Sequence, residues 1–307
     1  MKKVLVTGGT GFIGRNVTQS LLEKGYTVYA PSITPIESCE GLIQPQIDLF
    51  NKNELEQFLR DEQFENMIHL AWYVGSKCHS SDVNIDWLNL SLELLKAFKK
   101  YGGKRVLTAG SVSEYDFSYG WLRENHTPLT NGSMYGKCKA ALYSISCEYA
   151  KQNDLDFKWA RIFNLYGPNE KPQRLMPAVI NSMLAGEDVK VSDCSKIQDY
   201  LHVFDTAAAI VQFFESNVQG AVNICSSEPV RLRTIVEKIA QFTNYKGNIL
   251  WGAIPVSFED PFIVGDNTRL TKEVGWKQKY TMDEGLEQTV NWWKTHNMTN
   301  MGSLLNV

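Results

Sequence analysis

The 307-residue sequence lacks several features that mark common classes of protein. It has no basic excess, because 31 Lys and Arg against 34 Asp and Glu leave a net charge of −3, and this balance provides no positive field for nucleic acid. It has no apolar run of 18 residues that could span a membrane, and the first apolar run, residues 4–6, is too short for a signal peptide. We therefore expect a cytoplasmic protein that binds neither nucleic acid nor a membrane.

Clusters of metal-binding residues are also lacking. The six cysteines contain no Cys-x-x-Cys pair, and the five histidines show no spacing typical of a metal site. Scattered cysteines in a chain without a signal peptide are typical of reduced, mostly buried thiols. We therefore predict no metal, and we expect His69 and His202 to lie at strand ends with satisfied hydrogen bonds.

The apolar residues, 43% of the chain, follow an alternation of strands and helices. The patterns predict strands over 3–7, 26–30, 66–70, 104–109 and 156–162, and helices over 12–24, 52–62, 84–101 and 133–152. Such alternation is typical of an α/β fold with a doubly wound parallel sheet. After residue 168 the pattern changes, and helices near 174–185, 205–216 and 231–243 indicate a smaller lobe.

A glycine-rich turn lies directly between the first strand and the first helix. Residues 7–14 read Thr-Gly-Gly-Thr-Gly-Phe-Ile-Gly. In such a unit Gly8 makes the tight turn, Gly11 lets the backbone approach the phosphates, and Gly14 lets the helix close on the strand. The position of the motif in the chain predicts a dinucleotide site.

Tyr135 and Lys139 lie four residues apart in a predicted helix and so share one face. A cation within about 4–6 Å lowers the pKa of a neighbouring acid by about 1–3 units, which would bring a tyrosine toward the neutral range of a general acid or base. The spacing alone is common on exposed helices. However, Ser111 follows an apolar strand at the carboxyl edge of the sheet, where ligands bind, and we expect it to reach the same crevice.

Together these motifs resemble the extended short-chain dehydrogenase/reductase family, in its nucleotide-sugar branch. The resemblance covers nearly the whole chain, in order, and its further motifs are residues 47–49, 68–71, 161–168, 198–205, 222–224 and 274–276. It implies a Rossmann-type domain over 1–165, to which about 197–225 returns. It also implies a discontinuous substrate lobe over about 166–196 and 226–295, and we expect a loose tail over 296–307.

The resemblance implies the roles of individual residues. Ser111, Tyr135 and Lys139 would be catalytic, and the last two would also contact an NAD(P) cofactor. The other expected cofactor contacts are Gly8, Gly11, Phe12, Ile13, Gly14, Ser32, Asp48, Leu49, Leu70 and Ala71. Expected substrate contacts are Trp72, Ser113, Asn164 and Arg174, although Gln198 stands where the family usually has an Arg. A homodimer through the helices at 84–101 and 133–152 is also implied.

The choice between NAD and NADP stays open at this point. NAD-preferring relatives usually end the second strand with an Asp, whereas residues 28–32 contain no acid. No basic residue lies between Lys24 and Lys52 to favour NADP, and Arg15 is the only nearby candidate for a 2′-phosphate. Ser32 would hydrogen-bond either cofactor.

The reaction implied by the resemblance depends on the residues around Ser111. The family's dehydratases carry an Asp-Glu pair for which this chain has Val112 and Ser113, so we exclude dehydration. We favour NAD(P)H-dependent reduction of the C4 ketone of a nucleotide-linked 4-keto-6-deoxyhexose, because the missing ribose acid suits an exchanging cofactor and Trp72 and Tyr73 narrow the space that an epimerase needs. A 4-epimerase with tightly bound NAD is the alternative. A non-catalytic dinucleotide-binding protein is the second alternative, although Ser111, Tyr135 and Lys139 are all present.

Overall fold

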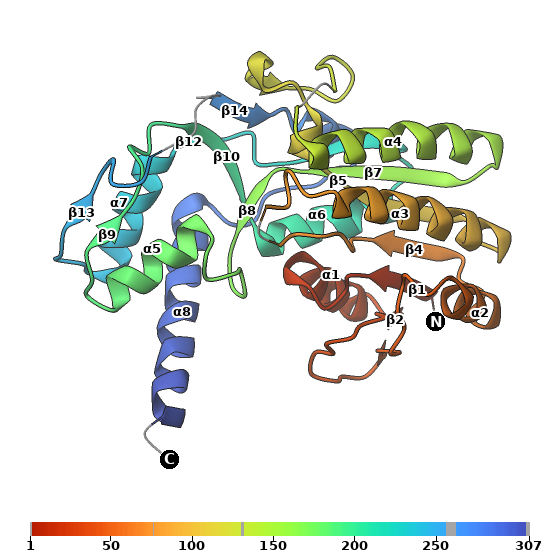
Figure 1. Ribbon diagram of the computed structural model, residues 1–307, viewed down its shortest axis with the longest axis horizontal. Coiled ribbons are helices and arrows are strands. Elements are labelled where there is room, and N and C mark those ends of the chain that lie inside the picture. Colours follow the sequence, from red (N-terminus) through yellow and green to blue (C-terminus); the bar gives the residue numbers. More distant parts are fainter. Residues whose placement is uncertain (1, 76, 130–131, 256–261, 305–307) are drawn as a thin grey trace.

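A seven-stranded parallel sheet forms the larger lobe of the computed structural model, which describes residues 2–75, 77–129, 132–255 and 262–304 (Figure 1). Its strand order is β11-β7-β5-β4-β1-β2-β3, and all neighbouring pairs are parallel. The order runs outward in both directions from β1 and β4, so the topological switch point lies between these two strands. The predicted doubly wound α/β fold is confirmed.

The sheet alternates with helices along the chain. Its strands are β1 (Lys2–Thr7), β2 (Tyr26–Tyr29), β3 (Leu42–Ile43), β4 (Asn66–His69), β5 (Arg105–Ser111), β7 (Asp156–Ile162) and β11 (Gly220–Ile224). Its helices are α1 (Phe12–Glu23), α2 (Lys52–Glu62), α3 (Val83–Lys100), α4 (Met134–Gln152) and α6 (Val203–Glu215). The predicted strand at 104–109 ends two residues too early, because β5 continues through Gly110 to Ser111.

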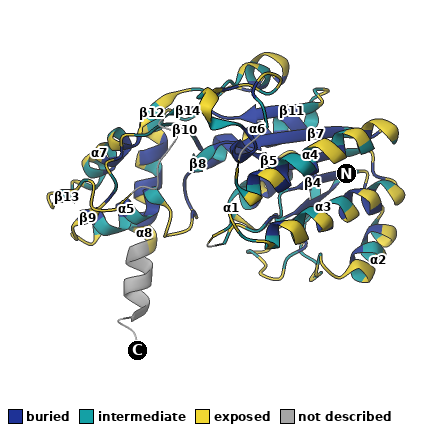
Figure 2. Cartoon of the chain, turned by 45° about the horizontal axis from the view of Figure 1, so that its top comes forward, coloured by how far each residue is buried: buried dark blue, intermediate teal, exposed yellow. Residues whose placement is uncertain are grey.

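Two apolar cores cover the two faces of the sheet. Val4 and Val6 of β1 pack in a core with residues of α1 and α6, whereas Leu5 packs in a core with residues of α2, α3 and α4. This division follows from the period of two in a strand, which sends successive side chains to opposite faces. Both faces are therefore apolar, as a parallel sheet between two layers of helices requires, and Figure 2 shows its strands in the buried colour.

The smaller lobe contains a second sheet and three helices. Its five-stranded sheet consists of β12 (Pro229–Arg231), β10 (Ile197–His202), β14 (Phe262–Gly265), β6 (Trp121–Leu122) and β8 (Asn164–Tyr166), the last of which pairs with β10. The helices α5 (Leu175–Leu184), α7 (Leu232–Thr243) and α8 (Met282–Leu304) share a third core with the strand pair β9 (Val189–Lys190) and β13 (Ile249–Leu250). This lobe lies at the left of Figure 1.

The chain passes between the lobes more than once. After β10 in the smaller sheet, α6 and β11 return to the large sheet, where α6 packs beside α1. The tail predicted over 296–307 overlaps the end of α8, and its last three residues lie outside the described residues. None of the helices described is long and apolar enough to cross a bilayer.

Candidate functional site

Ser111 is the last residue of β5, at the carboxyl edge of the large sheet, and it is buried. The single turn η1 (Val112–Glu114) follows it directly. The Ser111 hydroxyl accepts a hydrogen bond from the backbone N–H of Ser113 at 3.1 Å, and the Ser111 N–H donates to Glu114 Oε1 at 2.6 Å. This reciprocal capping box fixes Ser111 at the point where the strand ends.

Helix α4 brings Tyr135 to Ser111. The helix begins after Ser133, whose hydroxyl accepts a hydrogen bond from the Gly136 N–H at 3.0 Å. A Cβ atom on Gly136 would clash with the carbonyl oxygen of Ser113, so the helix can approach η1 only because this residue is a glycine. At this close approach the Tyr135 phenol lies near enough to the Ser111 hydroxyl for hydrogen bonding between them to lower the Tyr135 pKa. The structure thus brings together the two residues that the sequence predicted to share a crevice.

The protonation of Tyr135 differs from the sequence-based expectation. Burial raises the pKa of the phenol to about 12, although the hydrogen bond with Ser111 favours the phenolate. The prediction that Lys139 lowers the pKa of Tyr135 toward neutrality is therefore wrong. The physical reason is that the phenolate loses its hydration in this site, so Tyr135 is a protonated hydrogen-bond donor at neutral pH.

Lys139 lies one turn after Tyr135 and its side chain is only 3% exposed. Its ammonium donates to the Ala109 carbonyl oxygen of β5 at 2.8 Å. Burial lowers its pKa to about 7, against the attraction of the Glu114 carboxylate, which raises it. Lys139 is therefore poised between its charged and neutral forms near physiological pH.

Trp72 lies against both members of this pair and is buried. The Lys139 ammonium sits 3.7 Å from the centre of the Trp72 ring, and the Tyr135 ring meets it edge-on at 6.3 Å. His79 contacts Tyr135 from another side, with the ring centres 5.6 Å apart. The Trp72 indole N–H donates to Asn84 Oδ1 at 2.9 Å. Aromatic rings thus enclose the Tyr135–Lys139 pair.

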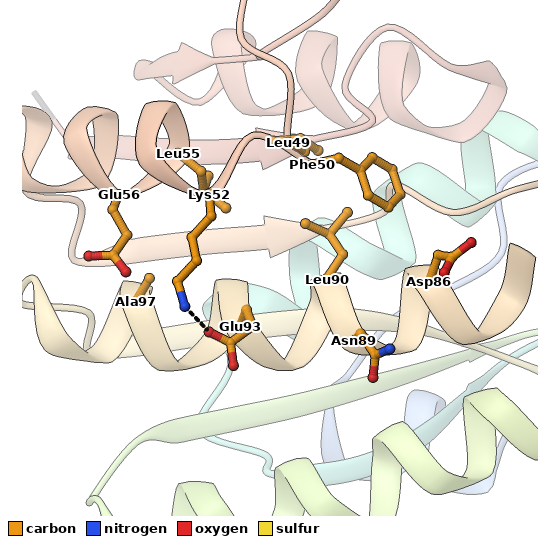
Figure 3. A pocket seen from close by; sticks show the side chains of 10 residues that line it. All are labelled: Leu49, Phe50, Lys52, Leu55, Glu56, Asp86, Asn89, Leu90, Glu93 and Ala97. Atoms are coloured by element: carbon orange, nitrogen blue, oxygen red, sulfur yellow. Dashed lines mark ion pairs between the residues drawn. The ribbon is translucent and has the colours of Figure 1, made fainter.

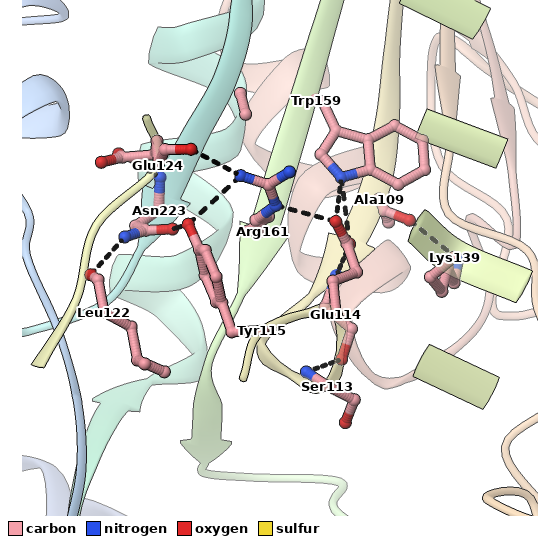
Figure 4. A network of polar contacts seen from close by, with 12 residues as sticks. Ala109, Ser113, Glu114, Tyr115, Leu122, Glu124, Lys139, Trp159, Arg161 and Asn223 are labelled. Atoms are coloured by element: carbon pink, nitrogen blue, oxygen red, sulfur yellow. Dashed lines mark hydrogen bonds and ion pairs between the residues drawn. The ribbon is translucent and has the colours of Figure 1, made fainter. Parts of the chain in front are cut away.

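A buried polar network is centred on Glu114 and Arg161 (Figure 4). The Glu114 carboxylate accepts hydrogen bonds from Arg161 Nε at 2.7 Å and from the Trp159 indole N–H at 3.0 and 3.1 Å. Arg161 also donates to the Tyr115 hydroxyl at 3.2 Å, and Tyr115 donates to Asn223 at 2.7 Å. Glu114 is fully buried, and its carboxylate accepts hydrogen bonds from the buried groups of Ser111, Trp159 and Arg161. This carboxylate therefore does not face a substrate.

The glycine turn has the geometry of an anion site. Gly8 has φ of +72°, and a Cβ there would lie 2.8 Å from the Ala71 nitrogen. A Cβ on Gly14 would clash with the Gly8 carbonyl oxygen, which explains why α1 can close on the turn. The first N–H groups of α1 lack intrahelical partners, and its N-cap, Gly11, has no capping side chain. This end of α1 therefore fits the pyrophosphate of a dinucleotide.

Two side chains near the turn bear on the choice of cofactor. Ser32, after β2, lies 2.9 Å from the Thr10 hydroxyl. The Arg15 guanidinium donates to Asn169 Oδ1 at 2.7 Å and to the Thr10 carbonyl oxygen at 3.3 Å. Arg15 is therefore already engaged by the loop that follows β8.

The other predicted cofactor residues follow strands β3 and β4. The Leu70 N–H donates to the carbonyl oxygen of Thr7 at 3.0 Å, and Ala71 lies against Gly8, so both border the glycine turn. Asp48 is exposed and accepts from the Phe50 N–H at 3.0 Å. Leu49 lines a cavity of about 340 Å³ between α2 and α3 (Figure 3), and no predicted catalytic residue lines it.

Asn164 and Arg174 line a second cavity of about 280 Å³ in the smaller lobe, beside β8, β10 and the start of α5. Glu170 is buried in the wall of this cavity, with its Oε1 atom 3.7 Å from Arg174 Nε, and its Oε2 atom has no hydrogen-bond partner in the part of the chain that the structure describes. Burial raises the pKa of Glu170 to about 7, against the opposing effect of Arg174. Two of the four residues predicted to contact substrate thus share one cavity with the Glu170 carboxyl group, which the sequence did not single out, whereas Trp72 and Ser113 do not line it.

The histidines lie at strand ends, as expected. His69, at the end of β4, has both ring nitrogens within hydrogen-bond distance, of Thr7 at 2.6 Å and of Ser91 at 2.8 Å. Burial lowers its pKa to about 3, so it stays neutral. His202, at the end of β10, accepts from the Phe204 N–H at 3.4 Å, but its Nε2 atom has no partner among the described residues, which differs from the expectation.

Comparisons with known proteins identify the family. Residues 4–225 match the model of the "NAD dependent epimerase/dehydratase family". The chain belongs to this family. It is 22% identical over 300 residues to CDP-abequose synthase from Salmonella muenchen, with 94% of this chain and 97% of the relative covered. It is 24% identical over 270 residues to dTDP-6-deoxy-L-talose 4-dehydrogenase (NAD(+)) from Aggregatibacter actinomycetemcomitans, with 85% and 98% covered.

Solved structures show the same fold. The crystal structure of UDP-glucose 4-epimerase from Thermotoga maritima with UDP-glucose superposes with a TM-score of 0.86 at 23% identity, covering 96% of this chain and 99% of that one. The chain is thus a member of a family of NAD-dependent enzymes that act on nucleotide sugars. Members are epimerases, dehydratases and reductases, so the family alone does not name the reaction.

Sequence reasoning missed several residues of this site. Glu114 and Arg161 lie inside or beside motifs that were recognised. Only the structure shows that they form an ion pair of 2.7 Å, which joins η1 to β7. Asn84 and Glu170 lie in segments without any recognised motif. A buried acid or amide can be recognised as important only from the residues that pack around it, and a single sequence does not show which residues these are.

Proposed function

We propose that this chain reduces the C4 ketone of a nucleotide-linked 4-keto-6-deoxyhexose. The observation that carries the proposal is the complete burial of Glu114. Its carboxylate accepts hydrogen bonds from Arg161, Trp159 and the Ser111 N–H, so it is not free to act on a substrate. Val112 and Ser113, the other residues after Ser111, offer no carboxyl group either. An acid and base pair for eliminating water is therefore missing beside Ser111, and redox chemistry at C4 remains.

Three side chains perform this chemistry. A reduced dinucleotide with its pyrophosphate held at the glycine turn would supply the hydride for the carbonyl carbon. Tyr135 donates its phenolic proton to the carbonyl oxygen, for which its protonated state at neutral pH is suited. Ser111 hydrogen-bonds the same oxygen as charge develops on it. The positive charge of Lys139 favours loss of the Tyr135 proton. The Lys139 side chain is buried and is fixed one turn after Tyr135 by its hydrogen bond to the Ala109 carbonyl oxygen.

Two features favour reduction over epimerisation. Ser32 follows β2, where the family resemblance expects an acid that would hold the ribose, and a serine there suits a dinucleotide that binds and leaves in each turnover. The relative dTDP-6-deoxy-L-talose 4-dehydrogenase is named for oxidation at C4 of a 6-deoxy sugar, and the reverse of such a reaction is the reduction proposed here. We propose NADH as the reductant, because Arg15 is engaged by Asn169 and Thr10.

A 4-epimerase is the second candidate, because the chain shares its fold with UDP-glucose 4-epimerase. The two candidates differ in the fate of the reductant, since an epimerase retains its NAD and consumes none. The test is incubation with NADH or NADPH and a panel of nucleotide-linked 4-keto-6-deoxyhexoses, followed by NADH absorbance. Stoichiometric oxidation supports the reductase. Tightly co-purifying NAD without consumption of added NADH rejects it.

We propose substrate contacts in the cavity beside β8 and α5, with the diphosphate near Asn164 and Arg174. We also propose that Ser113 borders the substrate, as the family resemblance implies. By the same resemblance, Asp48 and Leu49 would border the adenine. A homodimer through α3 and α4 is proposed because Ile85 and Ile145 expose 44% and 49% of their surface on these helices. Sedimentation of Ile145→Glu should show monomers where the native chain shows dimers. Dimers of this variant would reject that interface.

A further inference from the structure

Trp72 provides the face against which the Lys139 ammonium is packed. The ammonium nitrogen lies 3.7 Å from the ring centre, well within the range of about 6 Å for a cation–π interaction. The Lys139 ammonium also donates a hydrogen bond of 2.8 Å to the Ala109 carbonyl oxygen. One carbonyl oxygen replaces only part of the hydration that a buried ammonium has lost, so the indole face supplies a second favourable contact.

The Trp72 ring is held in this orientation by Asn84. The indole N–H donates to Asn84 Oδ1 at 2.9 Å, and the Asn84 amide nitrogen donates to the carbonyl oxygens of Cys78 and Ser81 at 2.6 and 2.7 Å. Asn84 is fully buried. Because all these groups are paired out of contact with water, rotation of the indole would leave a buried donor and acceptor unsatisfied.

The charged and titratable groups around Lys139 are few. From η1, Glu114 attracts the ammonium, but Arg161 pairs with the same carboxylate at 2.7 Å and offsets its field. From β4, His69 is neutral, because its pKa is lowered to about 3. From α4 itself, Tyr135 is protonated at neutral pH. Trp72 is therefore one of the few groups that favour the charged form of Lys139.

We propose that Trp72 is a positioning residue that holds the Lys139 ammonium charged and in place beside Tyr135, with Asn84 fixing the indole. The inference deepens the proposed function and rests on it, because it assumes that Tyr135 and Lys139 carry the reaction. It also revises the role expected for Trp72, which acts through Lys139 and not by touching the sugar. An aliphatic side chain of similar burial would fill the space but would not favour a cation.

The first test measures the contact without any turnover. Urea unfolding of the full chain is compared for the native protein, Trp72→Leu, Lys139→Met and the double variant, at pH 6 and pH 9. We expect a coupling of about tenfold in the unfolding equilibrium constant at pH 6, where Lys139 is charged, and little at pH 9. Equal coupling at both pH values, or none at pH 6, overturns the proposal. Trp72→Phe, which keeps a ring, replaces Trp72→Leu if the latter does not fold.

The second test separates positioning from simple packing. The alkaline limb of the kcat/KM profile for NADH-dependent reduction should move down by about one pH unit in Trp72→Leu and by less in Trp72→Phe, since loss of the ring disfavours the charged lysine. Trp87→Leu is the control, because the Trp87 ring packs against Trp72 with the ring centres 6.3 Å apart, whereas it is the Trp72 ring over which the Lys139 ammonium lies. An unmoved limb overturns the positioning role. Turnover retained by Tyr135→Phe instead rejects the proposed function, whatever the Trp72 variants do.

Discussion

Glu114 and Arg161 form an ion pair of 2.7 Å in which neither side chain reaches the solvent. The pair joins η1, the turn after β5, to the carboxyl end of β7, and Glu114 also accepts a hydrogen bond from the Ser111 N–H. Burying two charges is costly, and removing one partner leaves the other charge uncompensated. The position of Ser111 is therefore linked to the integrity of this pair.

Glu114→Gln should destabilise the fold by about 3–5 kcal/mol, because the Arg161 guanidinium would remain buried without a counter-charge. Urea unfolding measures this loss, and adding Arg161→Met should recover part of it. Glu93→Gln is the matched control, since Glu93 pairs with Lys52 at 3.3 Å on the surface and such pairs contribute about 0–1 kcal/mol. A loss below 1 kcal/mol in Glu114→Gln would show that the pair has no such role.

Gly136→Ala should reduce turnover by up to about a hundredfold, because its Cβ would clash with the Ser113 carbonyl oxygen and push Tyr135 away from Ser111. Steady-state kinetics measures this effect. Gly132→Ala is the control, because a Cβ there meets nothing within 4 Å. Equal activity of the two variants would contradict the close approach of α4 to η1.

Ser32→Asp should strengthen NADH binding by about tenfold and weaken NADPH binding, because a carboxylate accepts from the ribose hydroxyls and repels a 2′-phosphate. Titration of both cofactors measures the change. Ser32→Asn has a similar shape without the charge and should change neither affinity by as much. If Ser32→Asp leaves both affinities unchanged, Ser32 does not lie at the ribose.

Glu170→Gln should become more stable relative to the native chain as the pH rises from 5 to 8. The folded pKa of Glu170 is raised to about 7, so between about pH 4.5 and 7 the folded state binds more protons than the unfolded state. The stability contributed by the protonated carboxyl is thus lost as the pH rises through this window, by about 3 kcal/mol at most. Urea unfolding across the window tests this, with the exposed Glu187→Gln as control. A constant difference would contradict the burial of a titrating Glu170.

The large lobe was predictable because its signals are local. The glycine turn at residues 7–14, the alternating strands and helices, and the spacing of Tyr135 and Lys139 all lie within short windows of sequence. The strands of the smaller sheet, such as β8 and β12, contain only three residues each. Segments this short carry little periodicity, and their pairing depends on contacts with β10 that the sequence does not display.

The proximity of Ser111 to Tyr135 was predictable from the sequence, whereas the protonation of Tyr135 was not. Ser111 and Tyr135 form the expected pair, whereas the pKa of Tyr135 is raised by burial instead of lowered by Lys139. Desolvation depends on how deeply a group lies, and a spacing of four residues gives no measure of depth. The sequence also predicted that Trp72 narrows the space for the sugar, but it did not predict that the Trp72 ring packs against the Lys139 ammonium.

Transfer of deuterium from NADH tests the central claim most directly. The chain is incubated with NADH deuterated at the transferred position of C4 and with a nucleotide-linked 4-keto-6-deoxyhexose that it consumes, and the product is analysed by NMR and mass spectrometry. The account predicts one deuterium at C4 of the sugar for each NADH oxidised, and loss of this transfer in Tyr135→Phe. A sugar inverted at C4 without deuterium and without net oxidation of NADH would contradict it.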